Sequence, residues 1–270
     1  MVLEENIGFV GGGQMAEAII KGLLQSGLVE SSRITVIEPD ADRRKFLGDN
    51  YSVTTTTAPE DAEDCGIVLL AVKPQILGRV LEDYKGNLTG KHLVISIAAG
   101  IPISFIAEKL AAGSRIIRVM PNTPALILEG ASALSGGSGT TEKDMETGMA
   151  IFSAIGKCVR LEESYLDAVT GLSGSGPAYV FTFIDAMIDA GIKVGLKPDD
   201  ARELVLQTIL GSVKLVQEKD MHPAQLRSMV TSPGGTTITG LHALEKAAFK
   251  AAIMDGVEAA FNRSRELGQG

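Results

Sequence analysis

The chain has 270 residues, which is enough for one large domain or two of ordinary size. Hydrophobic residues make up 45% of it and charged residues 21%, and these proportions exclude an intrinsically disordered protein. The formal net charge is −8 and only 4% of the residues are aromatic, which argues against nucleic-acid binding. An anionic ligand would therefore have to be held by local groups.

The cysteines, histidines and apolar runs exclude further classes of protein. The two cysteines, Cys65 and Cys158, are too few for a disulfide scaffold, and the three histidines have no metal-ligand spacing. The uncharged stretch 93–107 is interrupted by Gly-Ile-Pro at 100–102 and is too short to span a membrane. We therefore predict a cytoplasmic protein that binds a small molecule and has no metal, no membrane and no nucleic-acid partner.

The first half of the chain alternates short apolar runs with segments of helical periodicity. The predicted strands are 7–10, 34–37, 67–72, 93–97, 116–120 and 158–161, and the predicted helices between them are 15–26, 40–49, 74–84, 104–111 and 142–155. These strands lack polar alternation, which is typical of strands buried on both faces of a parallel sheet. Strand–helix alternation of this kind predicts a doubly wound α/β domain.

The pattern becomes entirely helical after residue 162. The predicted helices are 165–171, 177–190, 198–217, 223–230 and 237–266. We therefore predict an α/β protein with an N-terminal doubly wound Rossmann-type domain, residues 1–162, and a C-terminal all-helical domain, residues 163–270.

The predicted helix 177–190 suggests what the helical domain does. The segment 178–188 carries a single charge, and a helix that is apolar all round is a buried helix. A helical domain of about 100 residues has little interior, so burial against a second subunit is the simplest solution. The alternative is a self-contained helical bundle.

A glycine-rich loop follows the first predicted strand and opens the first predicted helix. Residues 11–16 read G-x-G-x-x-A, which in this context is typical of dinucleotide binding. Gly11 would allow the tight turn, Gly13 would let a diphosphate approach the backbone, and Ala16 would keep helix and strand close together. The diphosphate would meet free N–H groups at the helix N-terminus. The alternative is a plain tight turn.

The end of the second predicted strand bears on the choice between NAD and NADP. A carboxylate at Glu38 would accept a hydrogen bond from a ribose 2′-hydroxyl and repel a 2′-phosphate, which favours NAD. Arg43 and Arg44 follow, and they would either hold that phosphate or lie on a solvated helix face. These residues alone lean to NAD and leave the choice open.

A second loop of small residues, 231–238, precedes the last predicted helix. Consecutive N–H groups from Gly234 to Thr237 would form a concavity that binds an anion such as a small carboxylate. The alternative is that Thr236 or Thr237 only caps the helix.

Together these features resemble the pyrroline-5-carboxylate reductase family over essentially the whole chain. The most specific segments are VTGLSGSGPAY at 169–179 and VTSPGGTTI at 230–238. The motifs AVKP at 71–74, SIAAG at 96–100 and MPNTP at 120–124 match as well. The resemblance implies hydride transfer from NAD(P)H to the ring imine of L-1-pyrroline-5-carboxylate, which yields L-proline in the last step of proline biosynthesis.

The resemblance also implies roles for individual residues. The implied cofactor-binding residues are Val10, Gly11, Gly12, Gly13, Gln14, Met15, Glu38, Ala71, Val72, Lys73, Pro74, Ile97, Ala98 and Ala99, and the implied substrate-binding residues are Ser232, Gly234, Gly235, Thr236, Thr237 and Asp220. Thr237 matches the catalytic position whose hydroxyl lies near the ring nitrogen. The family favours NADPH, but Glu38 and Ala58 depart from residues common in NADPH-preferring relatives, so NADH stays open as a cofactor.

The resemblance further implies a homodimer with interlocked helical domains. In such a dimer the loop 232–237 of one subunit completes the partner's site, and dimers often build larger rings.

Two other classes of function remain open. A β-hydroxyacid-type dehydrogenase would need a catalytic lysine on helix 177–190, which has none. A non-catalytic NAD-sensing module would bind nucleotide without consuming it and would not need the loop.

Overall fold

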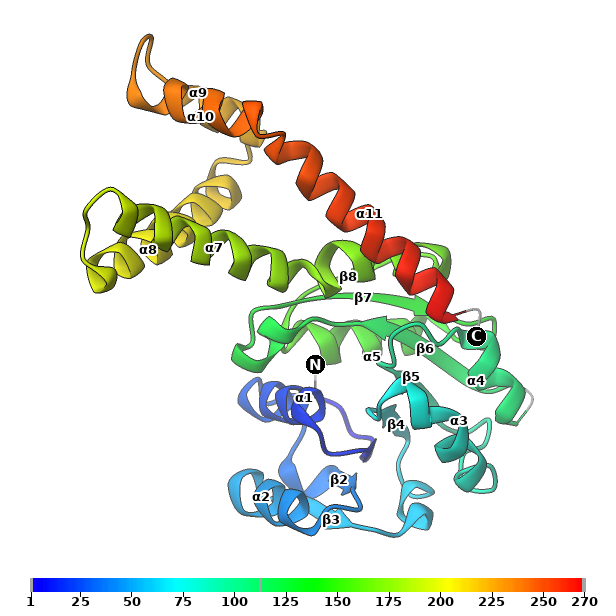
Figure 1. Ribbon diagram of the computed structural model, residues 1–270. Coiled ribbons are helices and arrows are strands. Elements are labelled where there is room, and N and C mark those ends of the chain that lie inside the picture. Colours follow the sequence, from blue (N-terminus) through cyan, green and yellow to red (C-terminus); the bar gives the residue numbers. More distant parts are fainter. Residues whose placement is uncertain (1, 112, 269–270) are drawn as a thin grey trace. The chain divides into compact units, whose positions relative to one another are not determined.

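The computed structural model describes residues 2–111 and 113–268 (Figure 1). Contacts divide the chain into two compact units. Unit 1 comprises Met1–Ser175 and Glu258–Gly270, and unit 2 comprises Gly176–Val257. The chain therefore crosses between the units twice, after Ser175 and after Val257.

Unit 1 is built around a sheet of eight strands within the described residues, in the order β3-β2-β1-β4-β5-β6-β7-β8. The strands are β1 Ile7–Val10, β2 Ile34–Ile37, β3 Thr54–Thr56, β4 Ile67–Leu70, β5 Leu93–Ser96, β6 Arg115–Met120, β7 Gly130–Gly136 and β8 Gly156–Arg160. Neighbouring strands pair in parallel except β6 and β7. The strand order reverses between β1 and β4, where doubly wound sheets open a ligand crevice.

Helices cover both faces of this sheet. They are α1 Gln14–Gln25, α2 Ala41–Tyr51, α3 Pro74–Asp83, α4 Ile103–Lys109, α5 Glu142–Ser153 and α6 Leu166–Val169. Phe9 of β1 lies in a buried cluster with Ile19 of α1 and Phe152 of α5. The next residue, Val10, lies in a second cluster with Leu77 of α3. Because successive side chains of a strand point to opposite faces, the sheet is buried on both sides, and the predicted doubly wound fold is confirmed.

Two strands, β3 and β7, escape prediction from the sequence. The strand β3 is three threonines at the edge of the sheet, and β7 reads Gly-Ala-Ser-Ala-Leu-Ser-Gly. Neither is a run of large apolar residues like β1, β4 and β5, because the β-branched threonines of β3 are polar and β7 consists mostly of Gly, Ala and Ser. Pairing with β6 and β8 on its two sides makes β7 a strand.

Unit 2 is helical, as predicted. It contains α7 Gly176–Lys193, α8 Pro198–Lys219, α9 Pro223–Met229, α10 Thr236–Lys246 and the first part of α11 Phe249–Gly268. The prediction of one helix over 237–266 is wrong, because the backbone at Ala248 turns into the left-handed region with φ +54°. The rings of Phe183 on α7 and Phe249 on α11 then lie with their centroids 6.0 Å apart.

The segment between α6 and α7 also differs from the prediction. The helix predicted over 165–171 ends at Val169, and Thr170–Gly174 forms a π-helical turn, η5. The amide of Ser175 donates to the carbonyl oxygen of Thr170 at 2.8 Å and closes this wider turn. Isolated π-helical turns are frequent at functional sites.

Across the described residues, no helix is long and apolar enough to cross a membrane.

Candidate cofactor and substrate sites

The glycine loop lies where the carboxyl ends of three strands meet. The amide of Gly11 donates to the carbonyl oxygen of Ile37 at the end of β2, at 2.9 Å. Gly11 has φ +96°, and a Cβ there would lie 2.8 Å from the carbonyl oxygen of Ala71, which follows β4. Both the backbone conformation and this close approach therefore require glycine.

The N-terminus of α1 opens toward free space. Gly13 is the N-cap residue of α1, and no side chain caps the helix. A Cβ on Gly13 would meet no heavy atom within 4 Å. The first amides of α1 have no partners within the helix, so they are available to an anion that fills this space. The N-terminus of α1 therefore has both the space and the free amides that a dinucleotide diphosphate needs.

A pocket of about 510 Å³ lies at the carboxyl ends of β1, β2 and β4. Seven of the predicted cofactor residues line it, namely Val10, Gly11, Gly13, Glu38, Ala71, Val72 and Lys73. Ile76, Val80 and Tyr84 line it too and escape prediction, although their spacing of four along one helical face could have revealed them. Burial raises the pKa of the Tyr84 phenol, so the phenol stays protonated.

The other predicted cofactor residues, Gly12, Gln14, Met15, Pro74, Ile97, Ala98 and Ala99, do not line this pocket. Gly12 is buried, and a Cβ there would lie 2.8 Å from Leu47 of α2. Pro74 begins α3, and Gln14 begins α1. The segment 97–99 follows β5 at the same edge of the sheet, because β5 is parallel to β4.

The Glu38 carboxylate is held against the glycine loop. It accepts hydrogen bonds from the amide of Gly12 at 2.7 Å and from the amide of Asp40 at 3.0 Å. Arg44 donates to the backbone carbonyl oxygens of Glu38 and Pro39. The Glu38 carboxylate therefore lines the pocket, and hydrogen bonds from two backbone amides fix its position.

The second arginine of this region is engaged as well. Arg43 donates to the carbonyl oxygen of Gly12 and forms an ion pair with Glu17 of α1. Tyr51 donates to the other oxygen of that carboxylate at 2.9 Å. Both arginines thus have protein partners.

The predicted substrate loop joins α9 to α10 in unit 2. Gly234 has φ +67°, and the amide of Gly235 donates to the carbonyl oxygen of Ser232 at 3.1 Å. Gly235 is the N-cap of α10 and no side chain caps it. The alternative that Thr236 or Thr237 caps this helix is therefore wrong.

Thr237 is half-buried in the first turn of α10, whereas Thr236 and Ser232 are exposed. Asp220 is an exposed residue that ends α8 in the left-handed conformation, with φ +47°. An aspartate tolerates this conformation better than most residues, which is a structural reason for its presence there. The described ranges contain no group of three or more His, Cys, Asp or Glu residues that could hold a metal ion.

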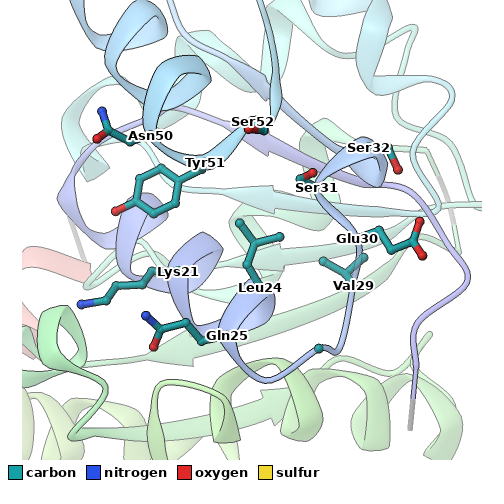
Figure 2. A pocket seen from close by; sticks show the side chains of 11 residues that line it. Lys21, Leu24, Gln25, Val29, Glu30, Ser31, Ser32, Asn50, Tyr51 and Ser52 are labelled. Carbon is teal, nitrogen blue, oxygen red and sulfur yellow. The ribbon is translucent and has the colours of Figure 1, made fainter.

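A larger pocket of about 800 Å³ lies at the opposite end of β2 (Figure 2). It is lined by the carboxyl-terminal turns of α1 and α2 and by the turn before β2, with Lys21, Gln25 and Tyr51 among its side chains. No predicted site residue lies there. Ligands of doubly wound sheets bind at the carboxyl ends of strands, so this pocket is not the candidate site.

Comparison with known proteins identifies the family. A model for pyrroline-5-carboxylate reductase dimerisation matches residues 163–267, and a model for NADP oxidoreductase, coenzyme F420-dependent, matches residues 6–100. Pyrroline-5-carboxylate reductase of Methanosarcina acetivorans is 44% identical, over 98% of each chain. The chain belongs to the pyrroline-5-carboxylate reductase family.

Solved structures of family members agree over the full length. The Plasmodium falciparum pyrroline carboxylate reductase with NADP bound is 36% identical with a TM-score of 0.89, over 99% of this chain and 100% of that one. The Coxiella burnetii enzyme is 35% identical with a TM-score of 0.93, over 98% and 99% of the two chains. The protein is thus an NAD(P)H-dependent oxidoreductase of proline biosynthesis that reduces pyrroline-5-carboxylate. Its dimerisation region implies a homodimer.

Proposed function

We propose that this reductase binds its dinucleotide in the pocket at the carboxyl ends of β1, β2 and β4, with the diphosphate at the N-terminus of α1. The observation that carries the proposal is the contrast between two glycines. Gly11 has no room for a side chain, whereas Gly13 faces open space at an uncapped helix end. When bound there, a reduced nicotinamide supplies the hydride that converts the ring imine to an amine.

The choice of cofactor follows from Glu38. Its carboxylate is held at the pocket lip by two backbone amides, and Arg43 and Arg44 have protein partners already. A 2′-phosphate would bring negative charge to this carboxylate, whereas a ribose diol would donate hydrogen bonds to it. NADPH, which the family resemblance implies, is therefore one of two usable cofactors, and NADH serves at least as well.

The substrate carboxylate binds at the loop Ser232–Thr237, at the uncapped N-terminus of α10. The open backbone at Gly234 and the free first-turn amides of α10 support this role. Thr236 and Thr237 supply those amides, and Gly234 and Gly235 let the carboxylate approach the backbone. The Thr237 hydroxyl holds the proton at the ring nitrogen while the imine carbon is reduced. A threonine hydroxyl is a weak acid, so most of the rate comes from positioning.

The complete site takes residues from two subunits of a homodimer with interlocked helical domains. Of residues 176–257, all of which the structure describes, only Ala201, Val205 and Leu226 are buried within a single chain. A unit with so few buried side chains is completed by a second copy of itself. The nucleotide unit of one subunit then works with the loop of its partner, and rings of dimers are compatible with this arrangement.

The proposal also covers the boundary between the two domains and the cellular location of the protein. The boundary between the nucleotide domain and the dimerisation domain lies between residues 162 and 163, next to the start of the segment that resembles the dimerisation region. Cys65 and Cys158 are free thiols, which supports a cytoplasmic location.

The test is the loss of absorbance of NADH, and separately of NADPH, when pyrroline-5-carboxylate is added to the purified protein. Oxidation of both, with a specificity constant for NADH at least equal to that for NADPH, is the expected result. A clear preference for NADPH would overturn the role of Glu38. Binding of either nucleotide without oxidation would overturn the substrate site.

A further inference from the structure

The chain leaves unit 1 once and returns to it once, and both crossings are held by residues of β6 or of the turn after it. The first crossing is the π-helical turn η5 with Ser175, directly before unit 2. The second crossing is α11, a continuous helix whose residues from Glu258 onward belong to unit 1. The residues that hold these two segments all lie in unit 1.

Asn122, two residues beyond β6, holds the first crossing. Its side-chain amide donates to the carbonyl oxygen of Ser173 in η5 at 3.0 Å, and its side-chain oxygen accepts from the amide of Ala131 in β7 at 2.8 Å. Asn122 is only 9% exposed, so both bonds are shielded from water. Met120 adds a packing contact, because a Cβ on Gly174 would lie 2.5 Å from its terminal methyl group.

Arg118 of β6 holds the second crossing through Asp167. Its guanidinium is buried, 3.3 Å from the carboxylate of Glu163 and 3.7 Å from that of Asp167. Asp167 in turn accepts a hydrogen bond at 2.7 Å from the hydroxyl of Ser264 on α11, and Ser264 is only 4% exposed. The charged group on the sheet therefore reaches the last helix through one carboxylate.

The end of α11 also touches the cofactor side of unit 1. A Cβ on Gly268 would lie 2.8 Å from the carbonyl oxygen of Gly100. Gly100 has φ +75° and directly follows Ala98 and Ala99, two of the residues to which we assign a cofactor role. A shift of α11 would therefore displace the turn that follows β5.

We propose that Asn122, Asp167 and Ser264 are positioning residues for imine reduction. They hold η5 and the end of α11 against β6 and the turn after it, and so they keep the turn after β5, at the nicotinamide end of the cofactor site, in position for hydride transfer. None of them is assigned a contact with substrate or cofactor. This inference rests on the proposed function, because it assumes that unit 1 binds the dinucleotide at the carboxyl ends of its strands.

Two conservative variants test the two crossings. Asn122→Asp keeps the size of the side chain and the acceptor for Ala131 but loses the donor to Ser173. Ser264→Ala loses only the hydroxyl that bonds to Asp167. The matched control is Ser132→Ala in β7, since the Ser132 side chain is equally buried and its hydroxyl has no hydrogen-bond partner among the described residues. Arg118 is unsuitable, because its loss would leave two carboxylates without their partner.

The measurements are kcat, KM for the imine, the dissociation constant of the reduced dinucleotide, the subunit mass in solution and the deuterium isotope effect with cofactor labelled at the transferred hydrogen. We expect kcat to fall about tenfold for Asn122→Asp and about threefold for Ser264→Ala, because small misplacements of reacting groups are costly. The isotope effect should rise in both variants as hydride transfer becomes slower. Cofactor affinity and dimer mass should stay within twofold of wild type.

Three results would overturn the proposal. They are an unchanged kcat in both variants, a loss of cofactor affinity that parallels the loss of kcat, and an equal loss of kcat in the Ser132→Ala control. If Asn122→Asp does not fold, the Ser264→Ala variant decides on the same readouts. An inactive wild-type protein would instead overturn the proposed function, so the two failures are distinguishable.

Discussion

At the scale of single residues, the role that we propose for Glu38 in cofactor preference can be tested by removing its charge. Glu38→Gln keeps the length of the side chain and one acceptor oxygen, so it removes the negative charge and one of the two hydrogen bonds from the amides of Gly12 and Asp40. We expect the ratio of the specificity constant for NADPH to that for NADH to rise about tenfold, because the repulsion of a 2′-phosphate is lost. Steady-state kinetics with each cofactor measure this ratio.

The control for Glu38 is Glu38→Asp, which keeps the charge on a shorter side chain and should leave the ratio near that of the wild type. If Glu38→Gln leaves the ratio unchanged, the carboxylate only holds the glycine loop through the two amides. The cofactor preference would then have to come from another residue.

Thr237 is the residue to which we assign the proton at the ring nitrogen. Thr237→Ala should lower kcat/KM for the imine by about tenfold or more, because an unpaired polar group costs about 1–3 kcal/mol in a closed site. Thr237→Ser keeps the hydroxyl and should retain most of the activity. Cofactor affinity, measured by fluorescence titration, should not change in either variant. Equal kinetic constants for the alanine and serine variants would remove the hydroxyl from the mechanism.

At the scale of helices and strands, the interior of unit 1 is predictable and its edge is not. The core strands β1, β2, β4 and β5 are short, mostly apolar runs, which is the pattern of strands buried on both faces of a sheet. The strand β7 is composed of small residues and becomes a strand only by pairing, which a local pattern cannot show. The break at Ala248 likewise has no glycine or proline to mark it.

The residues of the candidate site likewise divide into those that the sequence predicts and those that it does not. Gly11 and Gly13 are predictable because a glycine pattern between a strand and a helix has a known physical purpose. Thr57 of the same pocket follows the strand β3, which was itself missed. The bonds from Asn122 to Ser173 and from Asp167 to Ser264 join residues 51 and 97 positions apart, and no local pattern carries such information.

The N-terminal cap of α5 contributes to the stability of the protein, and a single substitution can test this contribution. The Thr141 hydroxyl accepts from the amide of Asp144, and the Asp144 carboxylate accepts from the amide of Thr141, which is a capping box. Thr141→Ala should lower the free energy of unfolding by about 1 kcal/mol, measured by urea denaturation.

The control for the cap is Thr147→Ala on the same helix. The exposed Thr147 hydroxyl bonds to a backbone carbonyl oxygen four residues earlier, a bond with little effect on helix stability. A loss of stability as large as that of Thr141→Ala would mean that the cap itself contributes nothing.

At the scale of the whole molecule, the helical region depends on dimerisation for its core. Of the described side chains that are large, apolar and exposed within a single chain, most belong to unit 2. On α7 they include Phe181 at 63% exposure and Val180 at 47%. Apolar surface of this extent is rare on a stable monomer and marks a subunit interface. The two units therefore differ in kind, since the sheet of unit 1 is already buried on both faces within one chain.

This difference predicts that the loss of the dimer separates cofactor binding from catalysis. Phe181→Glu places a charge in the expected interface and should yield monomers, because an unpaired charge is costly to bury. Light scattering after gel filtration measures the mass, with Phe181→Leu as a control that should remain dimeric. Unit 1 should still bind the reduced dinucleotide, whereas imine reduction should be lost because the partner's substrate loop is missing. A dimeric Phe181→Glu variant would place the interface elsewhere, and a fully active monomer would show that one chain completes its own site.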